Sequence, residues 1–70
     1  MELPDRIRYL KEVFLQEHGF YPELLYLGIK EQKEAKKLWF EYNDQRIIKF
    51  DGMKIIYTKN ETELRVCYGS

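Results

Sequence analysis

A run of four apolar residues, Leu24 to Leu27, most restricts the folds open to this chain, because it lies between Pro22 and Gly28. Four residues are too few for a stable helix, whereas a short apolar segment bounded by helix breakers is typical of a strand buried on both faces. The fold is therefore expected to contain a sheet that includes this segment.

Two amphipathic segments flank the apolar run. Residues 4–18 are predicted to form a helix that ends at Gly19, and residues 30–42 are predicted to form a second one. Each places its apolar residues on one side at helical spacing. These residues are Leu3, Ile7, Leu10 and Phe14 in the first segment, and Ala35, Leu38, Trp39 and Tyr42 in the second.

The rest of the chain is predicted to form three strands, at about residues 46–50, 53–58 and 64–68. Asp51-Gly52 between the first two is a strong signal for a tight hairpin. The last strand alternates, with Leu64, Val66 and Tyr68 on one face. The order α-β-α-β-β-β predicts an α+β fold in residues 1–70, a single small domain with two helices packed on a small, mainly antiparallel sheet.

Charge and composition exclude several classes of protein. Twelve Lys and Arg balance twelve Asp and Glu, and this neutrality disfavours sequence-independent nucleic-acid binding. One cysteine permits no intrachain disulfide, so a reducing cytoplasm is the expected location. No apolar run approaches the roughly 18 residues of a membrane helix, and the first residues do not resemble a signal peptide. The chain is expected to be complete, cytoplasmic and without a cofactor.

Residues capable of chemistry are few. His18 precedes Gly19 at a helix end, where an imidazolium interacts favourably with the helix dipole. Cys67 is expected to be a half-buried strand residue, and neither a nucleophile–base set nor a metal site can be assembled from this sequence. Gly28, between a strand and a helix, is only a weak candidate for anion binding. We therefore expect no enzymatic activity.

Two kinds of surface residue remain as candidates for binding. Lysines on the second helix form a strip that is either a solvated face, neutralised by neighbouring glutamates such as Glu31, or a site for an anionic ligand or acidic partner. Aromatic residues make up 16% of the chain, more than so small a core can bury. Trp39 and Phe40 are adjacent on a helix, so both cannot face one core. The candidate binding residues are Phe20, Tyr21, Lys30, Lys33, Lys37, Trp39, Phe40 and Tyr42.

The core, by contrast, is expected to take Phe14, Tyr26, Trp39 and Phe50. Because Tyr and Trp dominate protein interfaces, and because small domains often gain stability by oligomerising, we expect a homo-oligomer. The surplus aromatic residues are expected at its interface or in a pocket across it.

Two blocks of the sequence resemble a known group of proteins. Residues 21–28, Tyr-Pro-Glu-Leu-Leu-Tyr-Leu-Gly, are followed by Glu31 and Leu38, and later by Phe-Asp-Gly-Met-Lys-Ile-Ile at residues 50–56. Over residues 20–68 the chain resembles small bacteriophage and prophage accessory proteins, with a strand–helix–strand block like that in phage capsid-type proteins. The resemblance implies no catalytic residue. It implies a protein that occupies a host protein or sequesters a small ligand, including nucleotide signals of antiviral defence, and so acts in counter-defence.

The leading hypothesis is a non-enzymatic, phage-derived binding protein that blocks a host protein or sequesters an anionic small molecule. The first alternative is a structural or virion-assembly module that acts through its sheet edge. Nucleic-acid binding through the lysine strip is weaker because the chain is neutral. A small hydrolase that uses His18 and Cys67 is the last alternative.

Overall fold

The computed structural model describes residues 2–39 and 49–69, with only the backbone of residues 38 and 39. It contains two helices and four strands in the predicted order α-β-α-β-β-β, which confirms the α+β class. The elements are α1 (Leu3–His18), β1 (Leu24–Leu27), α2 (Ile29–Trp39), β2 (Lys49–Phe50), β3 (Met53–Tyr57) and β4 (Leu64–Cys67).

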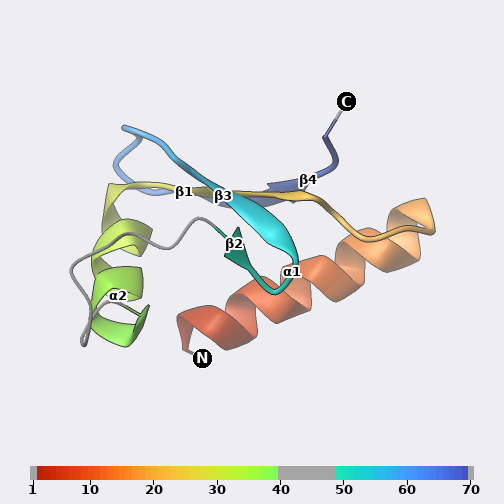
Figure 1. Cartoon of the computed structure of the whole chain (residues 1–70), viewed down its shortest axis with the longest axis horizontal. Coiled ribbons are helices and arrows are strands. Elements are labelled where there is room, and N and C mark those ends of the chain that lie inside the picture. The colour runs from red at the N-terminus through yellow and green to blue at the C-terminus, as the bar shows by residue number, and fades with distance from the viewer. Residues whose placement is uncertain (1, 40–48, 70) are drawn as a thin grey trace.

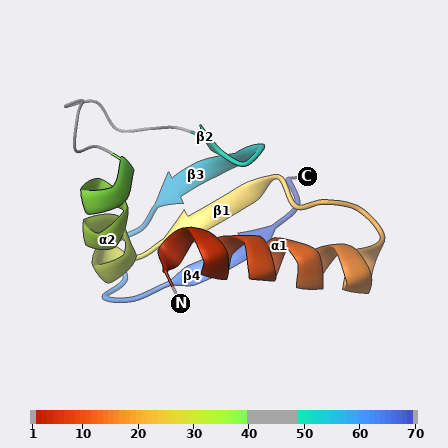
Figure 2. The ribbon, with the colours of Figure 1, turned by 90° about the horizontal axis from the view of Figure 1, so that it is seen from below.

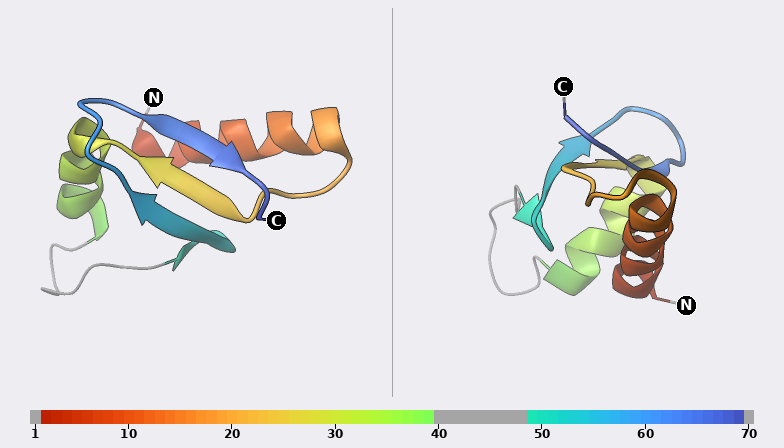
Figure 3. Two further views of the ribbon diagram at one scale, coloured as in Figure 1. Left: turned by 90° about the horizontal axis from the view of Figure 1, so that it is seen from above. Right: turned by 90° about the vertical axis from the view of Figure 1, so that its right-hand side faces the viewer.

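The four strands form one mixed sheet in the order β2-β3-β1-β4. β1 lies in its interior, parallel to β3 and antiparallel to β4, while β2 and β3 form an antiparallel hairpin. Both helices lie against the same face of the sheet (Figures 1 and 2). The opposite face, called the open face below, carries neither of the two described helices (Figure 3, left).

Most boundaries follow the predicted ones closely. α2 begins directly after Gly28, and the predicted extension of this helix over residues 40–42 lies outside the described residues, as do residues 46–48 of the first predicted hairpin strand. Asp51 and Gly52 form the predicted tight turn with φ of 52° and 84°. Gly19 ends α1 in the left-handed region with φ of 79°, which a glycine adopts without a Cβ clash.

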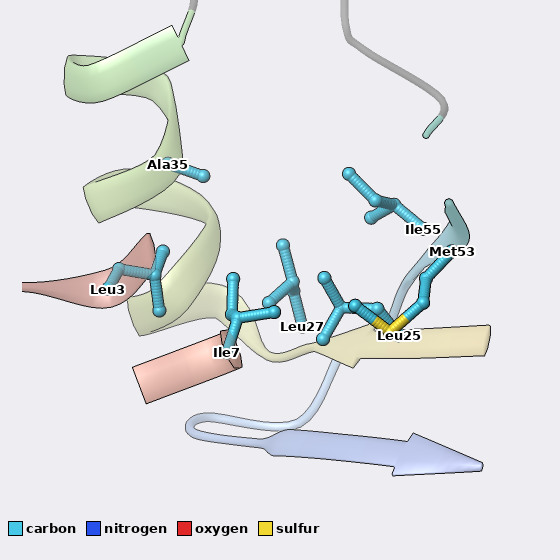
Figure 4. Close-up of a cluster of buried hydrophobic side chains, with 7 residues drawn as sticks. All are labelled: Leu3, Ile7, Leu25, Leu27, Ala35, Met53 and Ile55. Carbon is cyan, nitrogen blue, oxygen red and sulfur yellow. The ribbon is translucent and has the colours of Figure 1, made fainter. Parts of the chain in front are cut away.

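The core lies between the sheet and the helices (Figure 4). Side chains from both helices meet those of the two central strands, and alternation along β1 and β3 brings every second residue into this layer. The fully or nearly fully buried members are Leu3, Ile7, Leu25, Leu27, Ala35, Met53 and Ile55. Phe50, Tyr57, Leu64 and Val66 pack around them.

The prediction that β1 is buried on both faces is wrong. Leu25 and Leu27 are fully buried, whereas Leu24 and Tyr26 alternate onto the open face and are only half-buried. Tyr26 is therefore not part of the core that it was expected to fill. A continuous apolar run indicates a strand, but it does not show whether one face or both faces of that strand are covered by other elements.

Candidate binding surfaces

Four aromatic rings converge near the C-terminal end of α1. Phe14, His18, Phe20 and Tyr68, here called the aromatic cluster, contact one another in all six pairings, with ring centroids 4.2 to 6.4 Å apart. Phe14 is buried at 8% exposure and supports the others, while Phe20 and Tyr68 are 47% and 53% exposed. The edge-on contacts of Phe20 with Phe14 and Tyr68 are favourable ring geometries.

The chain builds this cluster from three segments. Gly19 turns the backbone at the end of α1, so that Phe20 lies against Phe14. Tyr68 follows β4 and continues the alternation of Leu64 and Val66 on the helix side of the sheet. The expected capping position of His18 is present in the last turn of α1. Its stacking on Phe14 at 4.2 Å was not predicted, although their spacing of four residues is a signal for it.

Tyr21 lies at a different place from its neighbour Phe20. The ammonium of Lys11 lies 4.8 Å from the centroid of the Tyr21 ring and forms a cation–π contact. The same Lys11 Nζ lies 3.2 Å from a carboxylate oxygen of Asp51 and donates a hydrogen bond to its backbone carbonyl at 3.0 Å. Lys11 therefore joins α1 to the β2–β3 turn, and Tyr21 packs on this lysine and not in the aromatic cluster.

The described lysines of the α2 strip lie far from the aromatic cluster, at the other end of the molecule (Figure 1). Lys30 and Lys33 line an open cavity of about 440 Å³ together with Ile29, Glu61 and Thr62. Lys37 is exposed in the last turn of α2. Phe40, Tyr42 and the side chain of Trp39 fall outside the described residues. The predicted binding residues therefore do not form one site among those that can be placed.

The first amides of α2 are occupied by the loop between β3 and β4. The amides of Gly28, Ile29 and Lys30 donate to the carbonyl oxygens of residues 63, 60 and 61 at 2.8, 2.8 and 3.0 Å. These are the groups that an anion would need at a helix N-terminus. The weak prediction that Gly28 receives an anion is therefore contradicted by the structure.

Glu31 is buried, with 2% exposure, and is not one of the solvated glutamates of the lysine strip. Its carboxylate accepts hydrogen bonds from the Thr62 hydroxyl at 2.6 Å and the Glu63 amide at 2.8 Å. Burial alone would raise the pKa of Glu31, but these hydrogen bonds outweigh it and hold the pKa below its ordinary value. Glu31 therefore fastens the β3–β4 loop to α2.

On the open face, the Arg65 guanidinium carbon lies 4.2 Å from the centroid of the Tyr26 ring. A side-chain hydrogen bond with Cys67 raises the pKa of Tyr26. Glu63 accepts hydrogen bonds from Asn60 at 2.8 Å and Arg65 at 3.2 Å, and the bond from Asn60 contributes most to lowering its pKa. Cys67 is half-buried on this face, as predicted.

Comparison with protein-family models, with curated proteins and with solved structures found no match. The resemblance to phage accessory proteins therefore stays a prediction. Within residues 2–39 and 49–69, no group of three or more His, Cys, Asp or Glu side chains is arranged to hold a metal ion. Neither described helix combines the length and the apolar character needed to cross a bilayer.

Proposed function

We propose that this protein is a non-enzymatic binding domain that docks on a partner protein through the aromatic cluster. The observation that carries the proposal is the exposure of His18, Phe20 and Tyr68 around the buried ring of Phe14. Exposed rings held by a rigid base are the residues that contribute most to protein interfaces, because they bury a large area with little loss of side-chain entropy.

The chemistry of the cluster indicates its partner. Phe20 offers only apolar surface, and His18 and Tyr68 add an imidazole and a hydroxyl, so the complementary surface is an apolar or aromatic patch with polar groups at its rim on another protein. The resemblance to phage proteins suggests a host protein in the cytoplasm, which the domain would block in counter-defence. The placement of His18 and Cys67 supports a role without catalysis. His18 lies in α1 on the helix side of the sheet, and Cys67 lies on the open face, so the two do not face one another.

The test compares three forms of the protein as bait in the cytoplasmic extract of a bacterial host. We expect the natural chain to retain a protein that the double variant Phe20→Ser/Tyr68→Ser loses at least tenfold. Tyr9→Ser is the matched control, because Tyr9 is 62% exposed and outside the cluster. The retained protein is then purified, and its affinity for each form is measured. Equal affinity for all three forms, or no retained protein, would refute the proposal.

A structural module is the second candidate function. The observation that favours it is the position of β4 at one edge of the sheet, where it pairs only with β1 among the described strands. An edge strand offers backbone groups to a further strand, from a second copy or from a larger assembly. This role implies association through β4, which Val66→Pro tests because it removes an amide of that strand.

A further inference from the structure

The open face of the sheet carries two rows of side chains, which the strand register defines. Lys49 lies opposite Lys54, which lies beside Leu24, which in turn pairs with Cys67. In the next row, Tyr26 lies between Ile56 and Arg65. Apolar side chains therefore occupy the middle of the face, and exposed cations lie on both sides of it.

The charge on the open face is unbalanced. Lys49 and Lys54 are directly opposed across an antiparallel pair, which is unfavourable for like charges. Among the described residues, no carboxylate forms an ion pair with either lysine. Glu63 lies on this face, but Asn60 and Arg65 already bind it, and the exposed Glu23 directs its carboxylate toward Gly69. The neutral composition of the chain therefore conceals a locally cationic face.

At the other side of the face, the Arg65 guanidinium and the Tyr26 ring form a stacked pair of flat groups. A nucleobase can extend such a stack whatever its sequence, because every base has a π face. The half-buried side chains of Leu24 and Ile56 lie beside the ring, where they offer an apolar surface to the sugar or to the base edge.

We propose that the open face binds single-stranded nucleic acid, with Tyr26 and Arg65 stacking a base and Lys49 and Lys54 contacting phosphates. The proposal is independent of the aromatic cluster, whose members lie on the helix side of the sheet. Charge complementarity argues against a second copy of this chain as the occupant, because two cationic faces would repel each other. Stacking of a base on Tyr26 also requires unstacked bases, which a single strand offers and a duplex does not.

The test is the fluorescence anisotropy of a labelled oligothymidylate of about 12 nucleotides, titrated with the full chain. Tyr26→Ala is expected to weaken binding about 5- to 150-fold, the loss expected for one stacked base. Lys54→Glu is expected to weaken it at least tenfold. With two phosphate contacts, the logarithm of the affinity should fall against the logarithm of salt with a slope of about −1.4, and Lys54→Ala should reduce that slope by about 0.7.

Lys33→Glu is the matched control, because it makes the same charge change at an exposed lysine of α2. Circular dichroism shows whether each variant keeps its fold. Unchanged binding by Lys33→Glu, together with weaker binding to duplex DNA, supports the proposal. Four results would overturn it: no binding at about 50 mM salt, an equal loss in Lys33→Glu, equal affinity for the duplex, or polyglutamate competing better than the oligonucleotide.

Discussion

Gly28 occupies a position that leaves no room for a side chain. A Cβ at this residue would meet the backbone amide of Glu63, and it would lie 2.7 Å from the carbonyl carbon of Thr62 and 2.9 Å from the carbonyl oxygen of Asn60. All three are backbone atoms, so the loop itself would have to move. Such a shift would also break the hydrogen bonds that this loop makes with the start of α2.

Gly28→Ala should therefore lower the free energy of unfolding by about 3 kcal/mol, the upper range for an overpacked site. Gly19→Ala is the control, because nothing lies within 4 Å of its Cβ position and only its left-handed φ is strained. That strain should cost about 1 kcal/mol. Urea denaturation measures the free energy of unfolding of both variants. Equal losses of stability would show that the β3–β4 loop can move to accommodate a Cβ at residue 28 at little cost.

Glu31→Gln should lower the free energy of unfolding at neutral pH by about 2 kcal/mol, because hydrogen bonds from Thr62 and Glu63 to a charged, buried oxygen are weakened. The pKa of Glu31 is lower in the folded state. Its contribution is therefore fully present above its ordinary pKa of about 4.5 and disappears as the pH falls through the folded value.

The gap in stability between the natural chain and Glu31→Gln should accordingly narrow below about pH 4.5. Glu34→Gln is the comparison, because Glu34 is more exposed and forms a 3.5 Å surface pair with Arg6. It should change stability by less than about 1 kcal/mol. Thermal unfolding between pH 3 and 7 measures both variants, and a constant gap for Glu31→Gln would contradict the assigned role.

Residue patterns could not predict Glu31 as a buried anchor. Its spacing places it among the charges of an amphipathic helix, and its two partners lie 31 and 32 residues away in the chain. The contact between the His18 and Phe14 rings, by contrast, could have been predicted, since Phe14 precedes His18 by one helical turn. Contacts within an element are visible in sequence, whereas contacts between distant loops depend on the whole fold.

The helices and strands themselves were predictable, because their apolar periodicities are strong. Helical spacing predicted α1 with its end at Gly19, and alternation predicted that Leu64 and Val66 share one face of β4, which the structure shows packed against the core. That Tyr26 is only half-buried was not predictable from β1 alone. It depends on both helices lying on one side of the sheet, which no local pattern in this strand reports.

β4 is the element through which we expect self-association. The carbonyls of Glu63 and Cys67 accept hydrogen bonds from Gly28 and Glu23, so they point toward β1. By alternation the amide of Val66 points away from β1, where a strand of a second copy could accept from it. We expect a dimer that pairs two β4 strands and extends the sheet.

Val66→Pro should abolish this dimer because proline has no amide hydrogen. Val66→Ala is the control, because it removes similar core packing but keeps the amide. Sedimentation of the natural chain and both variants over a range of concentrations measures the association. A monomeric natural chain, or a Val66→Pro variant that still forms the dimer, would exclude pairing through β4.

At the scale of the whole molecule, the predicted class and element order are confirmed, while the predicted binding residues are dispersed. Phe20 lies near the end of α1, Tyr21 contacts Lys11, and Lys30 lies at the start of α2. The surplus of aromatic residues in the composition predicted a binding surface but not its location. The distribution of these residues over the molecule depends on the mixed sheet, since α2 is the crossover between the parallel strands β1 and β3 and lies at the far end of the molecule from the C-terminal end of α1 (Figure 1).

The position of β1 in the sheet also sets the timing of folding. β1 is the first strand to be synthesised, yet its neighbours β3 and β4 begin to pair with it 30 and 37 residues later in the chain, counted from Leu24 to Lys54 and from Leu27 to Leu64. At about 5–20 residues per second, Leu24 to Leu27 wait roughly 1.5 to 6 s for the first partner strand. A nascent chain with an unpaired apolar segment is a target for chaperones, so newly made copies of this protein should depend on them before the sheet closes.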